Sequence, residues 1–105
     1  MERFAWKARL KPGMKEKYIK EHDEIWPEMT ELLNDAGIHN YTIWCFKDEL
    51  FGYFEAEKGV DFAMKVQTES PVVARWNNLM ADCMTMETDP DTGDVYPLQQ
   101  VFLHP

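Results

Sequence analysis

The sequence predicts an α+β fold whose elements follow the order βαββαβ, which is the order of a ferredoxin-like sandwich. Three observations support this prediction: alternating apolar residues near the N-terminus, two stretches with apolar residues at helical spacing, and an aromatic, β-branched hairpin between those stretches. The chain has 105 residues, enough for one modest core. We therefore expect residues 1–105 to form a single domain.

A strand and a long helix are predicted in the first third of the chain. Apolar residues fall at helical spacing from Met14 to Leu33, and Gly37 suits the end of this helix. Pro27 cannot donate a hydrogen bond to the carbonyl of Asp23, so the helix must kink or break just past His22. The strand before it is predicted from the alternating apolar side chains of Phe4, Trp6, Ala8 and Leu10.

The rest of the chain predicts a hairpin, two more helices and a closing strand. Residues 38–46 and 50–55 are rich in aromatic and β-branched side chains and surround a polar turn. Residues 61–67 are predicted to form a short helix. Ser70 and Pro71 predict the start of a second helix, with Ser70 as its N-cap and Pro71 at its first position. The closing strand is predicted at residues 98–103. The inner stripe of the last helix is predicted to contain Val73, Trp76, Asn77, Met80 and Met84.

The composition excludes several classes of partner. A net charge of −8 argues against nucleic acid and anionic membranes, because both favour clustered Lys and Arg. No apolar run approaches the roughly 20 residues of a membrane span, and Glu2 and Arg3 do not resemble the start of a signal peptide. Cys45 and Cys83 lie far apart with no metal-binding motif, which is typical of a reducing compartment. We expect a cytoplasmic protein without a metal site.

One face of the predicted sheet lacks a cover, because helices pack on the other face only. This bare face carries large residues in either register of its strands. An exposed aromatic face of this size is expected to pair with a second sheet. We therefore expect a homodimer.

The candidate functional residues begin on the first helix. Tyr18 and His22 lie one turn apart on its apolar face, where an unpaired buried polar group costs roughly 1–3 kcal/mol. Either the fold or a ligand must satisfy them. A single histidine on a helix face is more often structural than catalytic, and the helix alone leaves both roles open.

Several segments together resemble one known family. These segments are Tyr18-(x3)-His22-(x2)-Ile25-Trp26-Pro27-Glu28, His39-Asn40-Tyr41, Arg75-Trp76 and Leu98-Gln99-Gln100-Val101-Phe102. They resemble the L-rhamnose mutarotases, and the resemblance covers essentially the whole chain. It implies a dimeric α/β-barrel and cofactor-free interconversion of the α and β anomers of L-rhamnose.

The resemblance also implies roles for particular residues. His22 corresponds to the proton donor of the family, and Tyr18, Tyr41 and Trp76 correspond to residues that bind the sugar. Family members can carry a second Trp directly after the one matching Trp76, whereas this chain has Asn77. Exchanging an aromatic wall for an amide changes which sugar fits, so another deoxy sugar stays open as the substrate.

The chemistry of anomer exchange suits these residue types. Ring opening needs a proton on the ring oxygen while the anomeric hydroxyl loses one, and closing reverses both steps. Imidazole, with an unperturbed pKa near 6.5, can give and take protons near neutral pH, and Tyr18 could assist it. No cofactor is required. Two other functions stay open: a non-catalytic sugar-binding protein and a cofactor-free oxygenase of the same fold.

Overall fold

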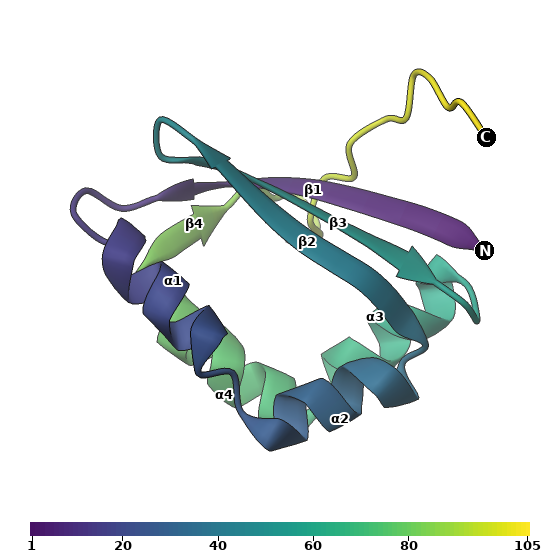
Figure 1. Cartoon of the computed structure of the whole chain (residues 1–105), viewed down its shortest axis with the longest axis horizontal. Helices are drawn as coiled ribbons and strands as arrows, with labels where there is room; N and C mark the ends of the chain where they lie inside the picture. Colours follow the sequence, from purple (N-terminus) through teal and green to yellow (C-terminus); the bar gives the residue numbers. More distant parts are fainter.

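The structure is a computed structural model that describes residues 1–105. It contains a four-stranded antiparallel sheet that helices cover on one face (Figure 1). The strand order is β2-β3-β1-β4. This order and the helical connections are those of the ferredoxin-like fold, which confirms the predicted fold class. The elements are β1 (Glu2–Leu10), α1 (Lys15–Asp23), α2 (Pro27–Asp35), β2 (Ile38–Phe46), β3 (Glu49–Ala56), α3 (Val60–Glu69), α4 (Pro71–Met80) and β4 (Met84–Met86).

Each of the two helical crossovers is divided into a pair of helices. In the first, Trp26 has an extended backbone and Pro27 begins α2, so the predicted break beyond His22 is confirmed. In the second, Ser70 separates α3 from α4, and its Oγ accepts hydrogen bonds from the backbone N–H groups of Val72 and Val73. The two breaks bend the helical layer around the sheet.

The core lies between the inner face of the sheet and this bent layer. The predicted alternation of β1 is confirmed, because Trp6, Ala8 and Leu10 are all buried. They pack in the larger of two apolar clusters together with residues from α1, α2 and α4. No charged side chain is buried. No helix is both long enough and apolar enough to span a membrane.

A β-bulge in β2 changes which side chains face the helices. The register between β2 and β3 shifts between His39 and Thr42, where Asn40 has a positive φ of 50°. Ile38 is therefore buried, His39 points outward to Glu57, and Tyr41 lies inward again. Simple alternation would place His39 on the same face as Tyr41, but the bulge inserts one extra residue and puts the two side chains on opposite faces.

The predicted closing strand at residues 98–103 is also wrong. The fourth strand is instead β4, which pairs with residues 8–10 of β1, and Pro97 makes a further isolated bridge to Trp6. Beyond Leu98, whose N–H donates to the carbonyl of Ala5, the chain leaves the sheet on the side away from the helices (Figure 1). Met84–Met86 thus pair with the end of β1, and residues 98–103 form no strand even though Pro97 and Leu98 meet β1 at Trp6 and Ala5.

The prediction that Met84 belongs to the inner stripe of the last helix is also wrong. The helix α4 ends at Met80, and a turn follows in which the N–H of Cys83 donates to the carbonyl of Met80. The carbonyl of Cys83 then accepts a hydrogen bond from the backbone N–H of Lys11, which brings the chain to the edge of β1. Met84 consequently begins β4.

Candidate functional site

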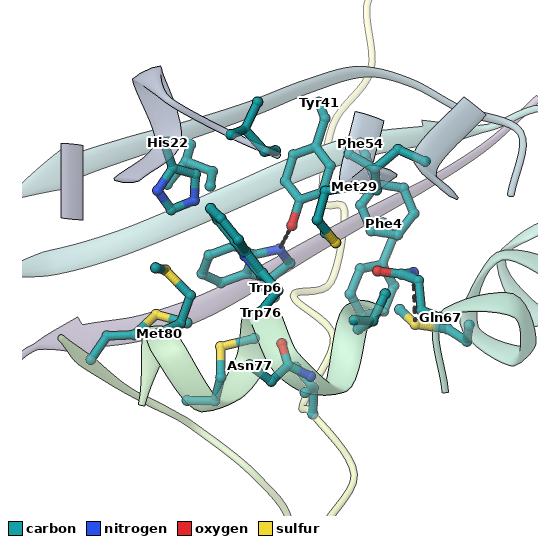
Figure 2. A pocket seen from close by; sticks show the side chains of 18 of the residues that line it. Phe4, Trp6, His22, Met29, Tyr41, Phe54, Gln67, Trp76, Asn77 and Met80 are labelled. Carbon is teal, nitrogen blue, oxygen red and sulfur yellow. Dashed lines mark hydrogen bonds between the residues drawn. The ribbon is translucent and has the colours of Figure 1, made fainter. Parts of the chain in front are cut away.

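A cavity of about 560 Å³ lies between the sheet and the helices (Figure 2). Most of the side chains around it are apolar, and a few polar groups point into it, as is usual for sites that bind small molecules. The residues predicted from the sequence all line this one cavity; they are Tyr18, His22, Tyr41, Trp76 and Asn77. The structure thus brings the candidate residues together from α1, β2 and α4.

His22 lies in the last turn of α1 and is half-buried. Its Nδ1 lies 2.8 Å from the backbone carbonyl oxygen of Tyr18. Because a carbonyl oxygen only accepts, Nδ1 must carry the proton and donate it in this hydrogen bond. The imidazole is therefore held in one orientation, and Nε2 is the ring nitrogen left for a ligand.

Aromatic rings surround the imidazole on two sides. The ring of Tyr18 lies 4.3 Å from that of His22 between centroids, and the ring of Trp76 meets the imidazole edge-on at 5.2 Å. Trp76 also contacts Trp26 edge-on at 5.3 Å, and the guanidinium of Arg75 lies 5.4 Å from the Trp26 ring. These contacts fix the break between α1 and α2 against α4.

Tyr41 reaches the cavity from the opposite layer. Its hydroxyl accepts a hydrogen bond of 3.0 Å from Nε1 of Trp6 (Figure 2). Burial raises the pKa of Tyr41 to about 12, although the hydrogen bond from Trp6 acts in the opposite direction. Burial likewise raises the pKa of Tyr18, and the neighbouring phenol of Tyr41 adds to this effect. Both phenols are thus neutral near pH 7 and can act as hydrogen-bonding groups there.

The helix α4 contributes an apolar wall and a polar rim. Trp76 is buried and turns its ring toward the cavity, whereas Asn77 is exposed at the cavity's edge (Figure 2). The neighbouring Asn78 is exposed and does not line the cavity. The cavity thus has an exposed amide directly after the buried apolar ring of Trp76.

Trp6 and Gln67 are among the cavity residues that were not found from the sequence. Trp6 could be recognised as inward-facing from the strand alternation, but its hydrogen bond to Tyr41 depends on the sheet order. Gln67 lines the cavity on the side away from His22 (Figure 2). Its Nε2 donates to the carbonyl of Ala63, which leaves Oε1 as an acceptor for a ligand. No three His, Cys, Asp or Glu side chains are grouped in a way that could hold a metal ion.

The fold and the cavity define a small α+β protein with an aromatic-lined cavity that carries a few hydrogen-bonding groups. Residues 3–104 match the family model described as L-rhamnose mutarotase. The chain belongs to the L-rhamnose mutarotase family. This match confirms the resemblance seen in the sequence, together with the anomer-interconverting isomerase class that it implied.

Individual relatives agree with this assignment along their whole length. An L-rhamnose mutarotase from Jannaschia sp. (strain CCS1) is 41% identical over 108 residues, covering 100% of both chains. One from Phocaeicola vulgatus is 38% identical and covers 97% of each. The crystal structure of an L-rhamnose mutarotase from Formosa agariphila superimposes with a TM-score of 0.80 at 31% identity, covering 100% of both chains.

A second solved structure shares the fold alone. Tetracenomycin F2 cyclase from Streptomyces glaucescens superimposes with a TM-score of 0.69 at 18% identity and covers 100% of both chains. The same architecture therefore serves a different reaction, and the chemistry of this chain has to be argued from its pocket residues.

The raised pKa of Tyr41 predicts a dependence of stability on alkaline pH. Below pH 10 the phenol is neutral in both the folded and the unfolded chain, so its contribution to the free energy of unfolding is fully present. Between pH 10 and about 12 the unfolded chain ionises first, and the free energy of unfolding falls. Tyr41→Phe should reduce this fall by up to about 2 kcal/mol in urea unfolding measured from pH 8 to 12.

The exposed Tyr96 provides the control for this prediction. Tyr96→Phe should leave the pH dependence of the wild type unchanged. If Tyr41→Phe and Tyr96→Phe give the same curve, burial of the Tyr41 phenol does not influence stability at high pH.

Proposed function

We propose that this chain interconverts the α and β anomers of L-rhamnose, with His22 as the proton donor. The observation that carries this proposal is the hydrogen bond from Nδ1 of His22 to the carbonyl of Tyr18. It orients the ring and leaves Nε2 free at a cavity whose walls suit a sugar with an apolar face.

The reaction begins with His22 in its protonated form. Nε2 donates its proton to the ring oxygen of the sugar, the bond between that oxygen and the anomeric carbon breaks, and the anomeric hydroxyl loses its proton to water. The carbonyl end of the open chain then rotates by half a turn. In the closing step Nε2 takes its proton back as the ring oxygen attacks the carbonyl carbon, and the new anomeric oxygen is protonated from water. Atoms and charge balance over the cycle.

The aromatic residues of the cavity bind the sugar in this proposal. Tyr18 and Tyr41 remain neutral and hydrogen-bond sugar hydroxyls, and Tyr18 also assists His22 by packing against its ring. Trp76 offers a flat apolar surface to the face of a 6-deoxy sugar that carries the methyl group. These roles rest on the common position of the side chains around one cavity.

Asn77 supports a second candidate substrate. Its exposed amide stands at the rim of the cavity, directly after the buried Trp76. An amide there can hydrogen-bond a hydroxyl that a tryptophan would exclude. A deoxy sugar other than L-rhamnose is therefore the alternative substrate, acted on by the same chemistry.

The outer face of the sheet supports a homodimer with the architecture of a dimeric α/β-barrel. Trp44 and Phe46 are 69% and 64% exposed, and Trp44 lies opposite Phe51 of β3. Val101 and Phe102 in the C-terminal segment are also largely exposed. Aromatic surface of this extent is usually covered by a partner.

The cysteines support a cytoplasmic location. Cys45 and Cys83 are both free thiols, one exposed and one buried. Exposed thiols persist in the reducing cytosol, whereas secreted domains of this size more often pair them. We place the protein in the cytoplasm on this basis.

Replacing the proposed proton donor should reduce the rate and remove its pH dependence. His22→Ala should lower kcat/KM for L-rhamnose by roughly 10²-fold or more, because a positioned acid contributes about 10²–10⁴-fold. Exchange between the anomers at equilibrium, followed by saturation-transfer NMR from pH 5 to 8, measures this. Tyr18→Phe should lower the rate less and keep the wild-type pH profile.

His39 is the matched control, since it lies outside the cavity and bonds Glu57 on the surface. His39→Ala should exchange the anomers as fast as the wild type. A pH profile that persists unchanged in His22→Ala would assign the proton transfer to another group.

Restoring an aromatic residue beside Trp76 should distinguish the two substrates. If L-rhamnose is the substrate, Asn77→Trp should tighten its binding by about 1 kcal/mol through stacking and burial. If the amide binds a hydroxyl of another deoxy sugar, the same change should weaken that sugar, because a polar group loses its partner. Titrations with L-rhamnose, L-fucose and related sugars measure both effects.

Asn78→Trp places the same side chain one residue further along α4, outside the cavity. It should leave every affinity unchanged. Equal affinities in Asn77→Trp and Asn78→Trp for all sugars would remove position 77 from the binding site.

The homodimer predicts a mass of about twice that of the chain at micromolar concentration, measured by sedimentation or light scattering. Trp44→Glu should dissociate it by placing a charge in the interface. Phe62→Glu is the control, because Phe62 is a partly exposed residue of the helical layer. A monomeric wild type, or an equal effect of both variants, would contradict an interface formed by the outer sheet face.

A further inference from the structure

The hydrogen bond between Trp6 and Tyr41 joins two strands that do not touch. Trp6 lies on β1 and Tyr41 on β2, and β3 runs between these strands. Neighbouring strands are about 4.8 Å apart, so the indole has to cross roughly twice this distance to reach the phenol. It crosses β3 at Gly52, which is the residue paired with Trp6 on one side and with Ile43 on the other.

Glycine is required at this crossing. A Cβ at position 52 would collide with Cε2, Cζ2 and Nε1 of Trp6. The indole therefore lies directly against the backbone of β3, and its Nε1 is directed at Tyr41 (Figure 2). On the other side, the bulge at Asn40 turns Tyr41 to the same face of the sheet. The bulge in β2 and the glycine in β3 thus together allow the hydrogen bond between Trp6 and Tyr41.

The chemistry of the indole sets the direction of the hydrogen bond between Trp6 and Tyr41. An indole N–H only donates, so the oxygen of Tyr41 accepts from Trp6. The hydroxyl proton of Tyr41 is then left for an acceptor elsewhere, and Tyr41 lines the cavity. Trp6 therefore determines both the position of the phenol and which hydrogen-bonding role it offers to a ligand.

We propose that Trp6 is a positioning residue, which, with Gly52 making room for it, holds Tyr41 as a hydrogen-bond donor to an oxygen of the bound sugar. This inference rests on the proposed function, because it concerns substrate binding in the same cavity. It assigns Trp6 no contact with the reacting atoms. Its effect on the reaction passes through the hydroxyl of Tyr41.

A double-mutant cycle with an isosteric tryptophan tests this role. Site-specific replacement of Trp6 by benzothienylalanine keeps the ring size but exchanges the N–H for sulfur. It should raise KM for L-rhamnose about three- to tenfold with kcat little changed, as expected for loss of one hydrogen bond in binding. In a Tyr41→Phe background the same replacement should change KM less than twofold. Trp44, which is exposed on the outer face, receives the same analogue as the control.

The outcomes separate this inference from the proposed function. Equal increases of KM in the wild-type and Tyr41→Phe backgrounds would mean that Trp6 acts by packing alone, and an unchanged KM would mean that it has no role. Either result overturns the inference while mutarotation by the wild type still stands. A wild type that exchanges no anomers of L-rhamnose or any related deoxy sugar would instead overturn the proposed function.

An NMR measurement tests the same contact independently of activity. The chain has four tryptophans, and the indole N–H signal of Trp6 should be the one that shifts most in Tyr41→Phe. Gly52→Ala should shift the same signal, because the added Cβ displaces the indole. An indole signal of Trp6 that stays in place in Tyr41→Phe would show that the hydrogen bond is absent in solution and would overturn the inference.

Discussion

The arrangement of the helical layer depends on the contacts of Trp76. Its buried ring meets His22 at the end of α1 and Trp26 in the break before α2, so one side chain of α4 holds both parts of the divided helix. Trp26 lies in the break itself, and Pro27 begins α2 directly after it. The packing of Trp76 that stabilises the break between α1 and α2 thus also positions the imidazole of His22. The stability of the helical layer and the geometry of the cavity therefore depend on the same side chain.

The cavity puts hydrogen-bonding groups within a largely apolar core, and their chemistry follows from that setting. A buried phenol is disfavoured in its charged form, so Tyr18 and Tyr41 have raised pKa values and remain neutral donors and acceptors. The imidazole of His22 is half-buried, and its Nδ1 donates to a backbone carbonyl. The fold therefore places one imidazole, oriented by a carbonyl of its own helix, beside two phenols that stay neutral hydrogen-bonding groups near pH 7.

Much of the fold follows from local pattern in the sequence. The alternation in β1, the cap at Ser70 and the missing N–H of Pro27 are short-range features, and each predicted its element correctly. The closing strand failed because strand formation needs a partner edge. Residues 98–103 have β-like composition, but only Leu98 among them donates a backbone hydrogen bond to β1, and the strand that pairs with residues 8–10 of β1 is Met84–Met86, whose first residue the helical pattern had assigned to the last helix. Which segment pairs with β1 is not visible in either segment alone.

The candidate site shows the same division between local and long-range information. His22 and Tyr18 were found because one turn of helix relates them, whereas His39 and Tyr41, which simple alternation would place on one face, lie on opposite faces of β2. A single extra residue at Asn40 reverses the face of everything after it, so no period-2 pattern across the bulge can be correct on both sides. The partnership of Trp6 with Tyr41 needs this bulge, the strand order and the missing side chain of Gly52 together. A contact that requires three such conditions is set by tertiary structure and cannot be predicted from any one segment of the sequence.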